Sequence, residues 1–496
     1  RPRAMSASPT SPSSSTPAAD APARGDAPWL WLAAGLAGYG LLAWWFPLAA
    51  NVGRTPPADI RTFAPTLPAG MLYALLVAAL HGVALKAVGR ATRRPLARPL
   101  ATAVLGGLLF ALPLLFAYPV NATDVYRYLI RGRIAAVYGQ SPFVAPPATF
   151  SGDPFLPLAG EWAGETSPYG PLWELVAAGV ARLSGDNLLL GVVLFKLLAV
   201  ACFLAAAAVL WAILRDRPGR LMATLLWAWN PALLLTFALN GHNDALMILW
   251  LLLGVWLGQR RPAAGFLVLC LAALTKPVAA LALPVLFIAW WRGAAGSRAR
   301  ARFAAAAVLG ALALTWLAFL PWAAPGRLAQ TPLELIGRLL REATGSGGFS
   351  PAVWLYFALG QRVAFESIGA ALRALFLLLA AGVLWRGWRG RPPARGAADL
   401  SFGYLTQALS FRVWYAVWPF PWLLLDADGD RAAAYRLRAG LWFLLLAQLS
   451  VVWYGQWRVT VFGGDHVVAH LLGVPLVFGL PWLLARRPLP GLTHPL

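Results

Sequence analysis

Long runs of apolar residues recur along almost the whole chain and constrain its fold more than any other feature. A helix needs about 20 residues to cross the roughly 30 Å hydrocarbon core of a bilayer. Runs that approach or exceed this length lie near residues 28–50, 70–88, 99–118, 188–214, 220–238, 244–259, 303–321, 366–387, 437–455 and 466–485. Shorter runs at 261–275, 278–292, 397–411 and 414–425 are typical of half-length or broken helices that other parts of a membrane protein surround.

The composition excludes a water-soluble globular domain. Hydrophobic residues make up 59% of the chain and charged residues only 12%, whereas soluble domains carry about 25% charged residues. We therefore predict an all-α, polytopic membrane protein with about 12–14 transmembrane or half-membrane helices. The segments between the runs predict an outward-facing layer of loops and interfacial helices.

The basic residues predict the orientation in the membrane. The net charge of +22 would suggest a nucleic-acid partner in a soluble protein, but here the basic clusters fall at every second connection between runs. This spacing follows the positive-inside rule, so we expect cytoplasmic termini, a multi-pass protein of the cell membrane and no nucleic-acid partner. The clusters lie at 86–98, 215–220, 260–261, 292–302, 386–395, 431–438 and 486–487.

The same pattern predicts the domain organisation. Residues 1–27 are rich in Ser, Pro and Ala without periodicity, which predicts a disordered cytoplasmic tail. No signal peptide is expected there, because the first apolar run is long enough to remain as an anchor. A single integral-membrane domain is predicted over 28–487, with outward loops at 119–187 and 322–365, followed by a C-terminal tail at 488–496.

The acidic residues favour chemistry at the outer surface over transport through the membrane. None of the 19 acidic residues falls in the middle of a predicted span. Ion-coupled transporters usually keep such a charge inside the membrane for a pathway or a proton relay. Most of the acids lie instead in the loops predicted to face outward, and Asp124 follows directly on an apolar run.

The segment after Asp124 predicts an interfacial helix, because apolar residues recur at helical spacing over 125–136. The neighbouring face carries Asp124, Arg127, Tyr128 and Arg131. A carboxylate and two guanidiniums could therefore line one wall of a cavity. The alternative is that Thr123 or Asp124 only caps this helix, with Arg127 neutralising the carboxylate.

The loop that follows, 138–187, is rich in proline and contains Ser167-Pro-Tyr-Gly-Pro171. Two prolines around Tyr169 stiffen the backbone, so the loop could hold this aromatic ring against a sugar. Alternatively, Pro171 simply starts a helix whose Trp173 lies at the membrane interface. Residues 171–184 are too few to cross easily, which predicts a re-entrant or surface helix.

The sequence Asn240-Gly-His-Asn-Asp244 closes the next outward turn. His242 and Asn243 could donate hydrogen bonds to phosphate or hydroxyl oxygens, while Asp244 orients them. The alternative is again structural: Gly241 ends one helix, and Asn243 or Asp244 caps the next. Two potential ligands, an imidazole and a carboxylate, are too few to predict a metal site.

Two further cations lie near predicted outward surfaces. Lys276 stands between two half-length runs and directly before Pro277, and a lysine at a broken helix is a good phosphate ligand. It could equally extend along apolar surface toward water without binding anything. Arg412 and Tyr415 lie in a segment rich in aromatic residues, which an interfacial tryptophan belt would also explain.

Several motifs in this order resemble those of the bacterial polyprenyl-phosphomannose-dependent mannosyltransferases of the C-type glycosyltransferase superfamily. The resemblance covers roughly residues 28–485 and is strongest between 120 and 290. The motifs are Asp124-Val-Tyr-Arg-Tyr128, Ser141-Pro-Phe143, Ser167-Pro-Tyr-Gly-Pro171, Asn230-Pro231, Gly241-His-Asn-Asp-Ala245 and Leu274-Thr-Lys-Pro277.

The resemblance implies an inverting transfer of a sugar, mannose in these relatives, from a polyprenyl-phosphate donor to a hydroxyl of a glycan or glycolipid acceptor at the outer face of the membrane. It implies that Asp124 is the catalytic base and that His242 and Asp244 lie in the same cavity. Lys276, Arg412, Arg127 and His242 are the expected donors to the departing phosphate, so that no metal or other cofactor is expected. The alternative function is a flippase or exporter of a polyprenyl-linked sugar, which would use the same cations to move a phosphate head group.

Overall fold

The computed structural model describes residues 28–93, 95–323, 333–334 and 348–489. The predicted tail 1–27, most of the predicted tail 488–496 and much of the predicted loop 322–365 lie outside these ranges. All regular secondary structure in the described residues is helical, and they contain no β-strand. This confirms the all-α prediction.

Six helical stretches within the described residues are long and apolar enough to cross a membrane, which confirms a polytopic membrane protein. Three are formed by the single helices α4 (Leu67–Ala91), α8 (Leu188–Ile213) and α17 (Phe365–Trp388). The other three join consecutive elements: α14 (Gly296–Phe319) with η5 (Leu320–Trp322), α20 (Arg431–Ser450) with η7 (Val451–Gln456) and α21 (Trp457–Thr460), and α22 (His466–Phe478) with α23 (Leu480–Leu484).

A seventh candidate span is bent rather than continuous, although the sequence predicted one uninterrupted span over 220–238. α9 (Arg220–Ala228) is followed by α10 (Pro231–Leu234) and η3 (Leu235–Leu239), and the two parts meet at an angle of 42°. Pro231 has no backbone N–H to continue the hydrogen-bond ladder. The Asn230 side chain instead accepts a hydrogen bond from the Ala232 N–H at 2.9 Å and starts a new helix.

Six shorter apolar segments complete the membrane domain in the described residues. They are α1 (Pro28–Trp45), α5 (Pro99–Leu115), α11 (Asp244–Gly258), α12 (Pro262–Thr275), η4 (Pro277–Ala282) with α13 (Leu283–Gly293), and η6 (Val413–Val417) with α19 (Phe420–Leu425). Against the 12 to 14 predicted transmembrane or half-membrane helices, the described residues contain six stretches long enough to cross a membrane, or seven with the bent pair, besides these six shorter segments. The helices α16 (Pro351–Ala358) and α18 (Pro393–Gln407) lie among them.

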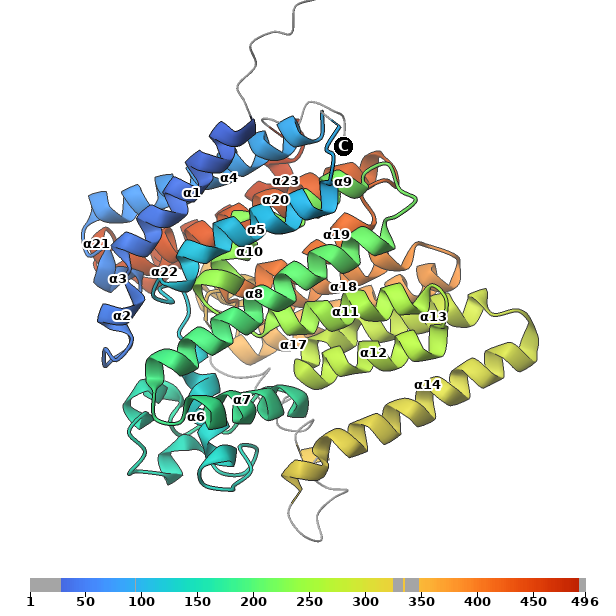
Figure 1. Cartoon of the computed structure of the whole chain (residues 1–496), viewed down its shortest axis with the longest axis horizontal. Coiled ribbons are helices and arrows are strands. Elements are labelled where there is room, and N and C mark those ends of the chain that lie inside the picture. The colour runs from blue at the N-terminus through green and yellow to red at the C-terminus, as the bar shows by residue number, and fades with distance from the viewer. Residues whose placement is uncertain (1–27, 94, 324–332, 335–347, 490–496) are drawn as a thin grey trace, which may run out of the picture.

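Short helices form a layer at one end of the long helices, as Figure 1 shows for α6 and α7. Its members are α2 (Leu48–Asn51), α3 (Ile60–Phe63), α6 (Asp124–Ala136), η1 (Pro147–Thr149), η2 (Leu156–Trp162) and α7 (Pro171–Ser184). α6 buries the apolar stripe that was predicted for it and packs against α7, with the Tyr128 and Trp173 rings 4.8 Å apart. Helices are therefore present both in the segment after Asp124 and at 171–184, where a re-entrant or surface helix was predicted.

The basic connections lie at the other end of the long helices. Figure 1 shows the α8–α9 and α13–α14 connections on the side of the molecule opposite to α6 and α7. The basic clusters 215–220 and 292–302 lie in and beside these connections. The fold thus separates these two basic clusters from the layer that carries Asp124.

Candidate active site

Asp124 is the first residue of α6 and only 4% of it is exposed. One carboxylate oxygen, Oδ1, accepts hydrogen bonds from the Arg127 guanidinium and from the Tyr169 hydroxyl, each at 3.1 Å. The other oxygen, Oδ2, is buried and has no hydrogen-bond partner among the described residues. Since a buried carboxylate oxygen without a donor is unfavourable, Oδ2 marks a place where a ligand group can bind.

Helix capping accounts for only part of this arrangement. Thr123 occupies the N-cap position, but its side chain makes no capping hydrogen bond. Arg127 does pair with the Asp124 carboxylate, as the capping explanation required. Because Arg127 and Tyr169 both bind Oδ1, this pairing leaves Oδ2 available.

The charge state of Asp124 is set by groups from distant parts of the chain. Burial raises the pKa of Asp124, but the positive charges around it outweigh burial and lower that pKa below its ordinary value. The cations responsible are Arg127, Lys276 and Arg412. The carboxylate is therefore ionised at neutral pH, and residues spread over almost three hundred positions meet around it.

The Ser167–Pro171 loop connects Asp124 to the end of α12. The Tyr169 N–H donates to the Ser167 hydroxyl oxygen at 3.1 Å, and the Gly170 N–H donates to the Thr275 carbonyl oxygen, also at 3.1 Å. A Cβ at Gly170 would lie 1.9 Å from the Leu274 carbonyl oxygen, so only glycine allows this approach. Pro171 is the first residue of α7, so the structural explanation for the prolines holds and Tyr169 still reaches Asp124.

His242 lies in the turn between η3 and α11 and is fully buried. Gly241 makes this turn with φ at +68°, a conformation that favours glycine. The imidazole stacks on the Trp414 ring at 4.3 Å, and its Nδ1 lies 3.4 Å from the Tyr128 hydroxyl, while Nε2 is buried without a partner in the described residues. Burial lowers the pKa of His242 to about 4, so the ring is neutral at pH 7 and the predicted hydrogen bond to a phosphate or hydroxyl oxygen would come from a ring N–H rather than from a cation.

Lys276 and Asp244 form a buried ion pair. The Lys276 ammonium donates to both carboxylate oxygens of Asp244, at 2.9 and 2.8 Å, and to Asn243 Oδ1 at 3.2 Å. Trp418 Nε1 also donates to Asp244. Gly241 does end η3 and Asp244 does begin α11, as the alternative explanation held, but Asn243 makes no capping hydrogen bond to α11. The Lys276 side chain is only 12% exposed, so it does not extend toward water.

The remaining predicted residues lie around this core in different roles. Arg131, which was predicted to line a cavity wall with Asp124, donates to the carbonyl oxygens of Glu165 and Thr166, at 3.4 and 3.3 Å, and so supports the loop. Arg412 is exposed and acts on Asp124 through its charge. Tyr415 stacks on Trp418 at 4.1 Å, and its ring centroid lies 5.8 Å from the Lys276 ammonium.

Several residues that complete this cluster were not among the predicted site residues. Trp414 and Trp418, which contact His242 and Asp244, had been explained by an interfacial tryptophan belt. The Ser167 hydroxyl donates to Glu174, a buried acid of α7 that was counted only as an outward charge. The spacing of seven residues between Ser167 and Glu174 across a helix start is the signal that could have indicated this pair.

Comparisons with known proteins match the part of the chain that carries most of this cluster. The family profile described as alpha-(1->6)-mannopyranosyltransferase, N-terminal domain, matches residues 29–295. Alpha-(1->6)-mannopyranosyltransferase A of Corynebacterium glutamicum is 33% identical over 183 residues, which cover 36% of each chain. The protein of the same name from Mycobacterium tuberculosis is 32% identical over 191 residues, 37% of this chain and 36% of the relative.

Alpha-(1->6)-mannopyranosyltransferase B of Corynebacterium glutamicum is 29% identical over 160 residues, 30% of this chain and 25% of the relative. The matched segments span about a third or less of the length of these curated relatives. No solved structure matches the chain significantly. The profile includes Asp124, Tyr169 and Lys276, whereas Arg412 and Tyr415 lie beyond it.

Proposed function

We propose a function for this chain from the premise that it belongs to the alpha-(1->6)-mannopyranosyltransferase family. It transfers mannose from a polyprenyl-phosphate-linked donor to a hydroxyl of a glycan or glycolipid acceptor, with inversion at the anomeric carbon. The donor chain lies in the membrane and the reaction takes place at the outer face. The observation that carries the proposal is the buried Oδ2 of Asp124, which has no hydrogen-bond partner among the described residues and lies beside a cluster of cations.

Asp124 acts as the general base. Its lowered pKa keeps the carboxylate ionised, and Arg127 and Tyr169 fix it through Oδ1, so that Oδ2 can accept the proton of the acceptor hydroxyl. The acceptor oxygen then bonds to the anomeric carbon while the bond from that carbon to the phosphate oxygen breaks. A positioned base of this kind contributes about 10²- to 10⁴-fold in rate.

The departing phosphate takes the bonding electron pair, and its charge must be held in the transition state. Arg412 is the exposed cation of the cluster and is the group that we assign to the phosphate. Lys276 is already paired with Asp244 and Asn243. This pair positions the turn that carries His242, and the Lys276 charge adds to the positive potential around the phosphate.

The other polar residues shape the substrate site. Tyr128 and His242 present a hydroxyl and a neutral imidazole side by side, 3.4 Å apart, which suits hydrogen bonding to sugar hydroxyls. Tyr415 and Trp418 form a stacked aromatic pair beside Lys276 that can pack against a sugar face. Arg131 and Tyr169 support the loop between these groups and Asp124.

The test is Asp124→Asn in protein reconstituted into lipid vesicles, with polyprenyl-phosphomannose as donor and a mannose oligosaccharide as acceptor. We expect transfer, measured by mass spectrometry of the product, to fall by about 10²-fold or more. Asp59→Asn is the matched control, because Asp59 also lies in the layer of short helices but bonds Arg61 in α3. Both variants must keep the wild-type melting temperature and elution volume.

Normal turnover by Asp124→Asn would contradict the assignment of this residue as the base. A flippase would give a different outcome: wild-type protein would move the lipid-linked sugar across the vesicle membrane without forming a mannosylated product. The same vesicles can report this movement through the accessibility of the sugar to an added lectin.

A further inference from the structure

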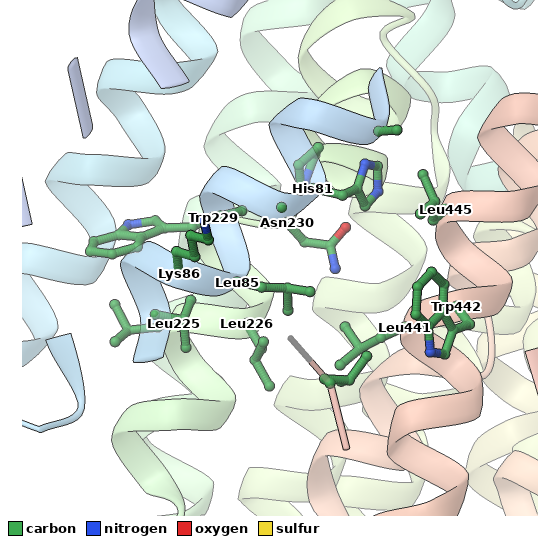
Figure 2. A pocket seen from close by; sticks show the side chains of 16 residues that line it. His81, Leu85, Lys86, Leu225, Leu226, Trp229, Asn230, Leu441, Trp442 and Leu445 are labelled. Carbon is green, nitrogen blue, oxygen red and sulfur yellow. The ribbon is translucent and has the colours of Figure 1, made fainter. Parts of the chain in front are cut away.

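A cavity of about 260 Å³ lies among α4, α9, α10 and α20, away from the candidate active site. The cavity lies closer to the basic connections than to the layer that carries Asp124. The residues of α4 that line it extend to Val88, close to the end of this helix, and α9 contributes Leu225 and Leu226. Figure 2 shows the leucines and tryptophans that line most of it. They include Leu225, Leu226, Trp229, Leu441, Trp442 and Leu445.

Two polar side chains, His81 and Asn230, lie at the same end of this cavity, above most of the leucines in Figure 2. Only 6% of His81 and 5% of Asn230 is exposed. His81 Nδ1 lies 2.8 Å from the Val77 carbonyl oxygen. A carbonyl oxygen can only accept a hydrogen bond, so Nδ1 carries the hydrogen.

The remaining ring nitrogen of His81 is therefore an acceptor. No acidic side chain lines the cavity to stabilise a protonated imidazole, and a buried unpaired charge is strongly unfavourable, so the ring is neutral. Nε2 then has a lone pair, and it is buried without a hydrogen-bond partner in the described part of the chain. Burial of such an acceptor costs about 1–3 kcal/mol, which favours a ligand that donates to it.

Asn230 offers a hydrogen-bond donor to the cavity, where His81 offers an acceptor. Its Oδ1 accepts the hydrogen bond from the Ala232 N–H at 2.9 Å, which fixes the amide so that Nδ2 is the group left to donate. The cavity thus presents one acceptor and one donor at its polar end. A single hydroxyl group, which both donates and accepts, can satisfy both.

The rest of the cavity suits a hydrocarbon chain rather than water. Its volume is far larger than one water molecule requires, and an apolar cavity of about 150 Å³ in another protein stays dry and binds benzene. Gly82 and Lys86 of α4 line the cavity and are exposed, and a Cβ at Gly82 would meet nothing within 4 Å. Because α4 is long and apolar enough to span the membrane, this opening faces the lipid.

We propose that this cavity binds a single-chain lipid alcohol, whose hydroxyl donates to His81 Nε2 and accepts from Asn230 Nδ2 while its hydrocarbon chain lies among the leucines. An alcohol fits better than a fatty acid, because an ionised carboxylate would meet the lone pair of Nε2 instead of a hydrogen. A plain alkyl chain would leave both polar groups unpaired. The ligand enters sideways from the bilayer past Gly82.

The experiment uses the full-length protein in phosphatidylcholine nanodiscs with two photoreactive probes. One probe is a long-chain alcohol with a diazirine in its chain, and the other is its methyl ether, which cannot donate a hydrogen bond. After illumination, labelled peptides are identified by mass spectrometry. We expect the alcohol to label peptides of α4 and α20 at the cavity about tenfold more than the ether, as one hydrogen bond to a buried group implies.

Three variants separate the cavity from the surrounding surface. His81→Leu removes the acceptor and should reduce labelling by the alcohol to the level of the ether. Gly82→Leu fills the opening and should abolish labelling by both probes. Ala79→Leu, on an exposed face of α4 that does not line the cavity, should leave labelling unchanged.

Equal labelling of wild-type protein by alcohol and ether would overturn the proposal, because binding would then not depend on the hydroxyl. The proposal would also be overturned if no peptides of the cavity were labelled. The same holds if excess phosphatidylglycerol removed the labelling and excess unlabelled alcohol did not. Folding of each variant is checked by its melting temperature. A rise in the melting temperature of the wild type with added alcohol, absent in His81→Leu, would support the site independently.

Discussion

At the scale of single residues, the two oxygens of Asp124 differ sharply. Oδ1 has two donors, Arg127 and Tyr169, whereas Oδ2 is buried and has none within the described residues. The first oxygen therefore fixes the carboxylate in place, and the second is available for a substrate hydroxyl. This division of roles predicts that changes at Oδ1 alter the basicity of Asp124 without removing the base.

Tyr169→Phe tests that division. Loss of the hydroxyl removes one hydrogen bond to the ionised carboxylate, so the pKa of Asp124 should rise toward its ordinary value. Activity requires the ionised form and is lost as the pH falls through this pKa, so the acid limb of the rate profile should move to higher pH. We also expect kcat at neutral pH to fall about tenfold. Product formation is measured from pH 8 down to below the ordinary aspartate value of about 3.9, because the acid limb lies there.

An unchanged acid limb in Tyr169→Phe would show that the tyrosine does not act through Asp124. Tyr138→Phe serves as the control, because the Tyr138 hydroxyl donates to Asp153 rather than to the candidate base. This variant removes a tyrosine hydroxyl from the same layer and should leave the acid limb in place.

Glu174 provides a second titrating group beside the loop. Burial raises its pKa to about 7, despite the Ser167 hydroxyl and the Arg131 charge that lower it. Between about pH 4.5 and 7 the folded protein holds this proton more tightly than the unfolded chain, so stability is greatest at the acid end and falls as the pH rises. The wild-type melting temperature should therefore decrease by a few degrees over this range.

Glu174→Gln removes the titration while it keeps the shape of the side chain, so this decrease should disappear. Melting curves recorded at several pH values for the wild type, Glu174→Gln and Glu161→Gln test the expectation. Glu161 is an exposed glutamate of η2 in the same layer of short helices and is the matched control. If the Glu174→Gln curve follows the wild type at every pH, Glu174 does not carry the effect.

At the scale of elements, the site depends on how the Ser167–Pro171 loop meets the break between α12 and η4. Gly170 lies directly against the Leu274 and Thr275 backbone. This contact places Tyr169 at Asp124 and lies immediately before Lys276, which binds Asp244. Three motifs far apart in the sequence are therefore joined by a single backbone contact.

Gly170→Ala should separate these elements. The added Cβ would lie 1.9 Å from the Leu274 carbonyl oxygen, so the loop must move and the hydrogen bond to Thr275 is lost. We expect a loss of about 1–3 kcal/mol in stability and a fall of about 10²-fold in kcat as Tyr169 is displaced. Gly164→Ala is the control, since a Cβ there meets nothing within 4 Å, and equal behaviour of the two variants would contradict this account.

Sequence periodicity and proline positions predicted these elements well because local physics sets them. The stripe over 125–136 and Pro171 gave α6 and the start of α7 within a residue. The partners of the side chains were not predictable in the same way. Arg127 binds Asp124, whereas Arg131 binds two carbonyl oxygens of the folded loop. The sequence could not predict this difference, because both arginines lie on the same helical face.

At the scale of the whole molecule, the prediction that Asp124, the His242 turn and Lys276 meet depended on counting membrane crossings. An error in one span does not change the outcome of that count. The break at Asn230 divides a span, but the turn that follows still lies at the same end of the long helices. The aromatic residues were less informative. Trp414 and Trp418 look like any interfacial tryptophans in the sequence, and only tertiary packing gives them His242 and Asp244 as partners.

The count of membrane crossings also predicts on which side of the membrane the layer that carries Asp124 lies. Ser151 lies in the layer that carries Asp124, and Ser297 lies in the basic first turn of α14; both are exposed, and the native cysteines Cys202 and Cys270 are buried. By the positive-inside rule, Ser151→Cys should react with a membrane-impermeant maleimide in intact cells. Ser297→Cys should react only after the membrane is permeabilised. The reverse pattern would place Asp124 on the cytoplasmic side and contradict a reaction at the outer face, while the unsubstituted protein controls for labelling of the native cysteines.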